Sequence, residues 1–103
     1  MSARYTQGMS GIGEAIVWTV HAPAGVDFTT ASSIALSAAV AGKTTRYLTA
    51  WVLVAQSATR LQATFIPTGA EFPSAESVTI RPTLTVDGVA YRYPKMTETV
   101  DPN

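Results

Sequence analysis

The dipeptide Asp87-Gly88 separates two runs of alternating apolar and polar residues, and it constrains the fold more than any other feature of the sequence. Two such residues between alternating runs predict a type I′ hairpin, because both central positions of that turn need a positive φ. The turn sets Val86 opposite Val89, and in this register the apolar residues of both strands share one face. Turn chemistry and residue pattern therefore predict the same antiparallel pair.

The same alternation recurs along the chain and predicts further strands. These are expected over residues 14–21, 33–40, 46–56, 59–66 and 77–86, with a last strand that ends at Pro94. The 46–56 segment is apolar on both faces, which predicts a strand covered on both sides. Residues 31–41 are rich in alanine and could also form a helix, but the alternation favours a strand. Pro82 has no N–H for a ladder, so its strand is expected at an edge or broken there.

The predicted fold is all-β: a single antiparallel β-sandwich of the immunoglobulin-like type, with six to seven strands. Residues 1–13 have three glycines and no apolar periodicity, and are expected to form an N-terminal arm. The sandwich domain is expected over residues 14–94, and a polar C-terminal tail over 95–103. Because such segments are mobile in an isolated domain, we expect neighbouring molecules to order them. Trp18 and Trp51 lie in apolar strands, and one or both are expected at the centre of the sandwich.

The charge balance argues against two classes of partner. The chain of 103 residues has seven basic and seven acidic side chains, and its charged fraction is 14%, against about 25% in an average domain. A net charge of zero gives no attraction to a phosphate backbone or an anionic membrane, so we expect neither nucleic acid nor membrane as a partner. The longest apolar run, residues 50–55, is far shorter than the roughly 18 residues of a membrane span.

Few side chains are suited to catalysis or metal binding. With no cysteine and one histidine, a transition-metal site lacks ligands, and we expect no metal and no cofactor. His21 ends an expected strand, where a solvated side chain is a simpler interpretation than a catalytic base. Glu71 and Glu76 resemble the carboxylate pair of a glycosidase in residue type, but solvated loop charges are again the simpler interpretation. We therefore expect a protein that is not an enzyme.

The composition instead favours assembly with other protein chains. A lone two-layer sandwich normally shows more charge on the outer faces of its strands, so the apolar second faces are expected to be buried against partners. Arginines on strand faces are also favoured at protein interfaces. The candidate interface residues are Tyr5, Ile12, Leu48, Val52, Val54, Arg60, Arg81 and Arg92.

Three stretches of the chain carry a resemblance to a known family. They are Tyr5-Thr6-Gln7-Gly8 before Ile16-Val17-Trp18-Thr19-Val20, Gly25-Val26-Asp27-Phe28-Thr29-Thr30-Ala31, and Thr85-Val86-Asp87-Gly88-Val89. Together they resemble the immunoglobulin-like N-terminal domain of baseplate upper proteins, among the structural proteins of bacteriophage tails and baseplates. The resemblance implies a non-enzymatic virion protein of the tail, baseplate or fibre attachment. It also implies other virion proteins as partners and a homo-oligomer or multi-copy assembly.

Two other functions stay open at this point. A capsid decoration (cement) protein would have the same small all-β build, and its place in the virion would differ. A carbohydrate- or ligand-binding β module would need an exposed aromatic side chain among Tyr47, Tyr91 and Tyr93.

Overall fold

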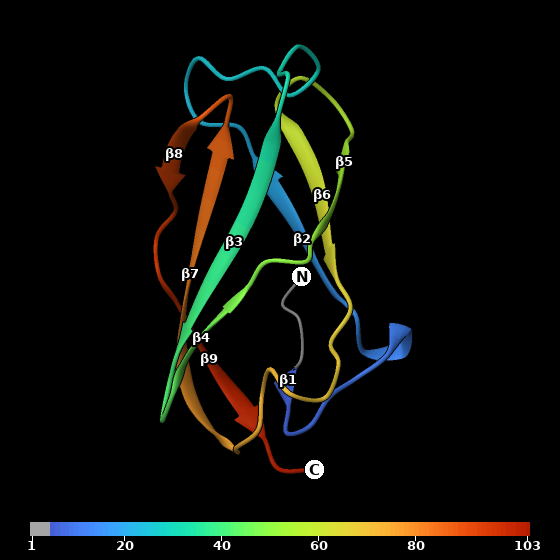
Figure 1. The fold of residues 1–103 in the computed structure, drawn as a ribbon, viewed down its shortest axis with the longest axis vertical. Coiled ribbons are helices and arrows are strands. Elements are labelled where there is room, and N and C mark those ends of the chain that lie inside the picture. The colour runs from blue at the N-terminus through green and yellow to red at the C-terminus, as the bar shows by residue number, and fades with distance from the viewer. Residues whose placement is uncertain (1–4) are drawn as a thin grey trace.

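The computed structural model describes residues 5–103, and nearly all of its regular structure is β-strand (Figure 1). The strands are β1 Tyr5–Thr6, β2 Ile16–His21, β3 Ile34–Ala41, β4 Thr45–Leu48, β5 Val52–Ala55, β6 Arg60–Phe65, β7 Glu76–Val86, β8 Val89–Arg92 and β9 Met96–Asp101. A short 3-10 turn, η1, covers Ile12–Glu14. The all-β prediction is confirmed, and residues 34–41 form a strand rather than a helix.

The strands form two sheets with the core between them. The larger sheet has the order β1-β9-β7-β3-β4, with β8 also paired to β7, and the smaller sheet has the order β2-β6-β5. β1 and β9 run parallel, and the other pairs among the described strands are antiparallel. The sandwich is as predicted, although the larger sheet is mixed rather than purely antiparallel and residues 5–103 form nine strands rather than six to seven. The immunoglobulin-like type stays a prediction.

The Asp87-Gly88 hairpin has the predicted geometry. Both residues have positive φ, 49° and 83°, as a type I′ turn requires, and Val86 lies opposite Val89. The Asp87 carboxylate also accepts hydrogen bonds at 2.8 and 2.9 Å from the backbone N–H groups of residues 32–33. The turn therefore fixes both the hairpin register and the start of β3.

Pro82 lies within an eleven-residue strand between β3 on one side and β8 and β9 on the other. The prediction of an edge strand or a break at this residue is therefore wrong. Its carbonyl accepts a hydrogen bond from the N–H of Tyr93 at 2.9 Å. Because the N and O of a strand residue point toward the same neighbour, the missing donor faces the link between β8 and β9. The hydrogen-bond ladder on that side of β7 is already interrupted between β8 and β9. The missing donor of Pro82 therefore does not break β7.

The expected strand over 46–56 is two strands in different sheets. β4 pairs with β3, β5 pairs with β6, and residues 49–51 cross from one sheet to the other. The indole N–H of Trp51 donates to the carbonyl of Leu48 at 2.8 Å and fixes this crossing. The prediction of one strand covered on both sides is wrong, because β4 and β5 each leave one face exposed to solvent.

Two tryptophans join the two halves of the core. Trp18 and Trp51 pack against both buried clusters, and their ring centroids are 4.5 Å apart. Trp51 also contacts Phe65 at 5.3 Å, within the usual range for aromatic pairs. The predicted position at the centre of the sandwich is confirmed for both tryptophans.

Both terminal segments contribute to the sandwich, which differs from the expected free arm and tail. Tyr5 of β1 pairs with Val100 of β9, and both side chains are buried. Tyr5 packs on Phe72 with ring centroids 5.2 Å apart, and Met9 is buried in the same cluster. The described parts of the two segments thus pair with each other within one chain. Residues 1–4 of the expected arm lie outside the described residues, and ordering by neighbouring molecules stays a prediction.

Substitution of Asp87 by alanine removes the two hydrogen bonds to residues 32–33 and leaves a less suitable residue at positive φ. We expect the free energy of unfolding to fall by about 1–3 kcal/mol. Asp87→Asn keeps an oxygen acceptor and tolerates positive φ, so it should lose less than half as much. Urea denaturation measures both; equal losses would contradict this role of the acceptor.

Candidate functional site

Exposed apolar side chains gather on the outer face of the smaller sheet. Val17 of β2 is 41% exposed, and Val52 and Val54 of β5 are 60% and 55% exposed. Thr64 of β6 lies between Val17 and Val52, and Gln62 lies beside Val54, in adjacent rows of the sheet. We call the surface formed by these five residues the valine face.

The borders of the valine face contain little charge. Ile66, which directly follows β6, extends the apolar surface and is exposed. Arg60 lies at the opposite end of β6, beside His21 of β2. Sheets with one solvated face normally alternate apolar and polar residues, so a central area of valine, threonine and glutamine is suited to burial against another protein.

The structure brings together some of the predicted interface residues. Val52 and Val54 belong to the valine face, and Arg60 lies at its border. Ile12 is exposed in η1, the turn that leads into β2. Val17 and Ile66 were not among the predicted interface residues. The outward parity of Val17 along its strand was the signal that pointed to it.

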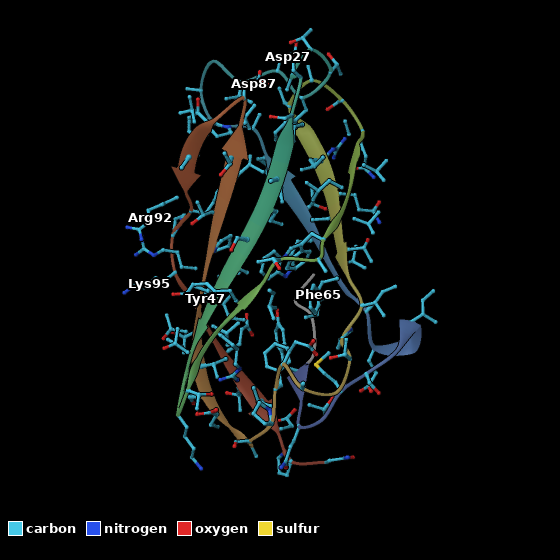
Figure 2. The ribbon with its side chains drawn as sticks, viewed as in Figure 1. Asp27, Tyr47, Phe65, Asp87, Arg92 and Lys95 are labelled. Carbon is cyan, nitrogen blue, oxygen red and sulfur yellow. The ribbon has the colours of Figure 1, made fainter. Side chains whose placement is uncertain are left out.

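Arg81 and Arg92 lie elsewhere, on the outer face of the larger sheet. Arg92 lies opposite Thr83, which shares the outward parity of Arg81 along β7. Figure 2 shows Arg92 projecting from the side of the molecule formed by β8, away from the smaller sheet. These two arginines therefore do not belong to the same surface as the valines.

Tyr5 and Leu48 are buried, so their prediction as interface residues is wrong. Tyr5 belongs to β1 and packs inward on Phe72. Leu48 is the last residue of β4, and its side chain belongs to the same core cluster. Neither side chain is available to a partner while the sandwich is closed.

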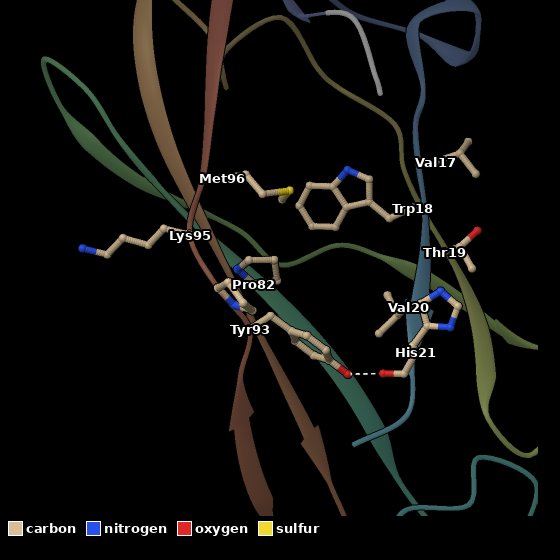
Figure 3. Close-up of a pocket in the computed structure, with 10 residues that line it drawn as sticks. Val17, Trp18, Thr19, Val20, His21, Pro82, Tyr93, Lys95 and Met96 are labelled. Atoms are coloured by element: carbon tan, nitrogen blue, oxygen red, sulfur yellow. Dashed lines mark hydrogen bonds between the residues drawn. The ribbon is translucent and has the colours of Figure 1, made fainter. Parts of the chain in front are cut away.

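A cleft of about 740 Å³ lies beside β2, on the side of the sandwich opposite the β4–β5 crossing (Figure 3). Its walls are residues 17–21 on one side and Pro82 with residues 93–96 on the other. The Tyr93 hydroxyl donates a hydrogen bond to the His21 carbonyl at 2.6 Å and spans the cleft (Figure 3). Apolar groups dominate its interior, where Trp18 and Met96 face each other (Figure 3).

Glu71 and Glu76, the two carboxylates compared above with a glycosidase pair, each stabilise a loop by accepting hydrogen bonds. Glu71 accepts hydrogen bonds from the N–H and hydroxyl of Thr68 at 2.8 and 2.7 Å. Burial raises the pKa of Glu71, but these hydrogen bonds outweigh it and leave the pKa below its ordinary value. Glu76 accepts a hydrogen bond from the Lys43 N–H at 2.7 Å, and one of its oxygens lies 3.8 Å from the Arg46 guanidinium.

Neither metal-binding groups nor membrane-spanning helices nor relatives assign a function to this chain. Within residues 5–103, no group of three or more histidine, aspartate or glutamate side chains is placed to hold a metal ion. The same part of the chain contains no helix of the length and apolarity needed to cross a membrane. Comparison with protein-family models, curated proteins and solved structures found no match to this chain.

Gly42 lies directly against the carboxylate of Glu76, where an added Cβ would be 2.7 Å from Oε1. Gly42→Ala should push this carboxylate away from the Lys43 N–H and, through the loss of that hydrogen bond, lower the free energy of unfolding by about 1 kcal/mol. Gly13→Ala is the matched control: no atom lies within 4 Å of its added Cβ, and its effect should stay within about 0.5 kcal/mol. Equal losses in urea denaturation would contradict the role of the contact.

Alkaline pH should destabilise the fold through its buried tyrosines. Burial raises the pKa of Tyr5 and of Tyr93 above the ordinary value, which is about 10. Their contribution is present below about pH 10 and is lost as the pH rises toward the higher pKa of the folded state. The free energy of unfolding should therefore fall as the pH rises above about 10, and fall less for Tyr5→Phe with Tyr93→Phe. An identical fall in this double variant, measured by urea denaturation, would contradict the assignment.

Proposed function

We propose that the chain is a non-enzymatic structural protein of a bacteriophage virion, which assembles with other virion proteins in the tail, baseplate or fibre attachment. The observation that carries the assembly role is the valine face, where three exposed valines surround uncharged side chains. The resemblance of residues 5–8, 16–20, 25–31 and 85–89 to baseplate upper proteins supports the virion setting. The structural use of Glu71 and Glu76 supports a role without catalysis.

The energetics of the valine face suit a multi-copy assembly. Full burial of a valine side chain is worth about 1.5–3 kcal/mol, so covering three half-exposed valines contributes about 2–4 kcal/mol. That corresponds to roughly 30- to 1,000-fold in affinity. Association itself costs several kcal/mol in lost freedom, so this face contributes most where many copies or further contacts hold the partners together.

Ligand binding is a second candidate because one aromatic side chain is well exposed. Tyr47 is 66% exposed and lies opposite Ala39 on the outer face of the larger sheet. Tyr91 and Tyr93 are half-buried and offer less surface. Binding of the chain to a glycan array, lost in Tyr47→Ala, would favour this candidate over assembly.

Imaging of intact phage particles that contain the chain tests its location. The proposal expects density for the sandwich in the tail or baseplate, with the valine face covered by a neighbouring subunit. Density on the head instead would favour a capsid decoration protein. A valine face open to solvent in the particle would contradict the assembly role of that surface.

Val52→Lys combined with Val54→Lys should remove the chain from assembled particles. Two lysines on the valine face would have to be desolvated in the interface, so we expect incorporation to fall at least about tenfold. Both side chains point to solvent in the isolated chain, so folding should be little changed. Ala90→Lys, at an exposed position of the other sheet, is the matched control. Equal incorporation of the two variants, measured in purified particles, would contradict the proposal.

A further inference from the structure

One edge of β2 borders the cleft, and no strand covers it. β2 pairs with β6 on one side only and has six residues, whereas the edge strands β4, β5 and β8 have four each. Proteins usually protect such edges with short strands, proline, lysine or bulges, because unpaired backbone groups invite another strand. Residues 16–21 contain neither proline nor lysine, and they pair with β6 in unbroken register.

The backbone groups at this edge point into the cleft. Ala22 donates its N–H to the carbonyl of Thr59 at 2.9 Å, which places the groups of even-numbered residues on the side of β6. Successive strand residues direct their N–H and C=O groups to opposite sides, so those of Val17 and Thr19 face away from β6. Within residues 5–103, these outward groups have no hydrogen-bond partner. They offer two donors and two acceptors at the spacing of a β-ladder.

We propose that this edge accepts an extended segment of a partner protein as an additional strand of the smaller sheet. Only a peptide main chain matches donors and acceptors at this spacing, and strand addition is a common mode of peptide recognition. Apolar side chains at alternate positions of the added strand would enter the cleft beside Trp18 and Met96. The inference rests on the assembly role proposed above and names the part of the partner that docks here.

The charges near the cleft favour an acidic segment. Lys95 lines the cleft and no carboxylate does, and the Lys95 side chain extends away from β2 (Figure 3). Arg60 lies beside His21 on β6, across β2 from the free edge. Figure 2 shows Lys95 and Arg92 projecting from the part of the molecule that forms the other wall of the cleft. An added strand with a glutamate or aspartate at the His21 end therefore complements the local charge.

A second copy of β2 fits this edge less well than a segment of another protein. A two-fold pairing centred on Thr19 would use the outward groups of Val17, Thr19 and His21 together. The carbonyl of His21 already accepts the Tyr93 hydroxyl at 2.6 Å. The free part of the edge is therefore limited to Val17 and Thr19, which suits a short added strand.

The test uses the full chain and a short synthetic peptide in which threonine and valine alternate, with glutamate at one end. Amide hydrogen exchange by NMR reports pairing directly. In the free chain, the N–H groups of Val17 and Thr19 should exchange at least about 100-fold faster than those of Trp18 and Val20, which face β6. Saturating peptide should slow exchange at Val17 and Thr19 at least about tenfold. Unchanged exchange at millimolar peptide would overturn the proposal.

Two forms of the peptide, N-methylated on one or the other alternate set of amides, provide the matched control. One edge of the added strand pairs with β2 and the other does not, so only one methylated form should retain the protection. Equal protection by both forms would overturn strand addition in favour of simple apolar binding in the cleft.

Variants of the chain separate this proposal from the assembly role. Thr19→Pro removes an outward N–H that β6 does not use and should abolish the protection, whereas Thr19→Val should retain it. The Val52→Lys, Val54→Lys variant should bind the peptide as the unaltered chain does. If peptide binding fails while that variant is still lost from particles, the added strand is rejected and the assembly role stands. Loss of peptide binding in Thr19→Val as well would overturn the backbone pairing proposed here.

Discussion

The larger sheet depends on β7, because β3, β8 and β9 all pair with it directly. Its inward side chains, among them Ile80 and Leu84, enter both core clusters. Pro82 is compatible with this central position because its missing donor faces the link between β8 and β9. One long strand therefore accommodates two shorter partners along the same edge, and the interruption between them forms one wall of the cleft.

The parts of the fold that follow from local chemistry were predictable from the sequence. The Asp87-Gly88 turn requires two positive φ angles, and the alternation around it sets the register, so the hairpin could be specified residue by residue. The alternation over residues 59–66 was equally clear, and Leu61 and Phe65, which share one side of it, are buried. One or both of Trp18 and Trp51 were expected at the centre because large aromatic side chains bury the most surface.

The parts that depend on distant pairing were not predictable in this way. Nothing local distinguishes one apolar run from two strands in different sheets, so the crossing at residues 49–51 was missed. Tyr5 was expected at an interface. Its strand partner Val100 lies at the other end of the chain, so no local pattern could reveal that Tyr5 is buried. At the candidate site the pattern identified Val52 and Val54 as apolar, but only the sheet order shows which face they share with Val17. The free edge of β2 likewise depends on which strand lies beside it.

The parallel pairing of β1 with β9 allows the fold to close only after β9 has been synthesised. β9 lies between β7 and β1, so Tyr5 has no strand to join until residues near Val100 exist. A nascent chain that lacks β9 exposes half of one edge of β7, together with the buried face of β1. The domain therefore reaches its closed state only when almost its whole length is available, and a truncated chain presents strand edges that invite association with other chains.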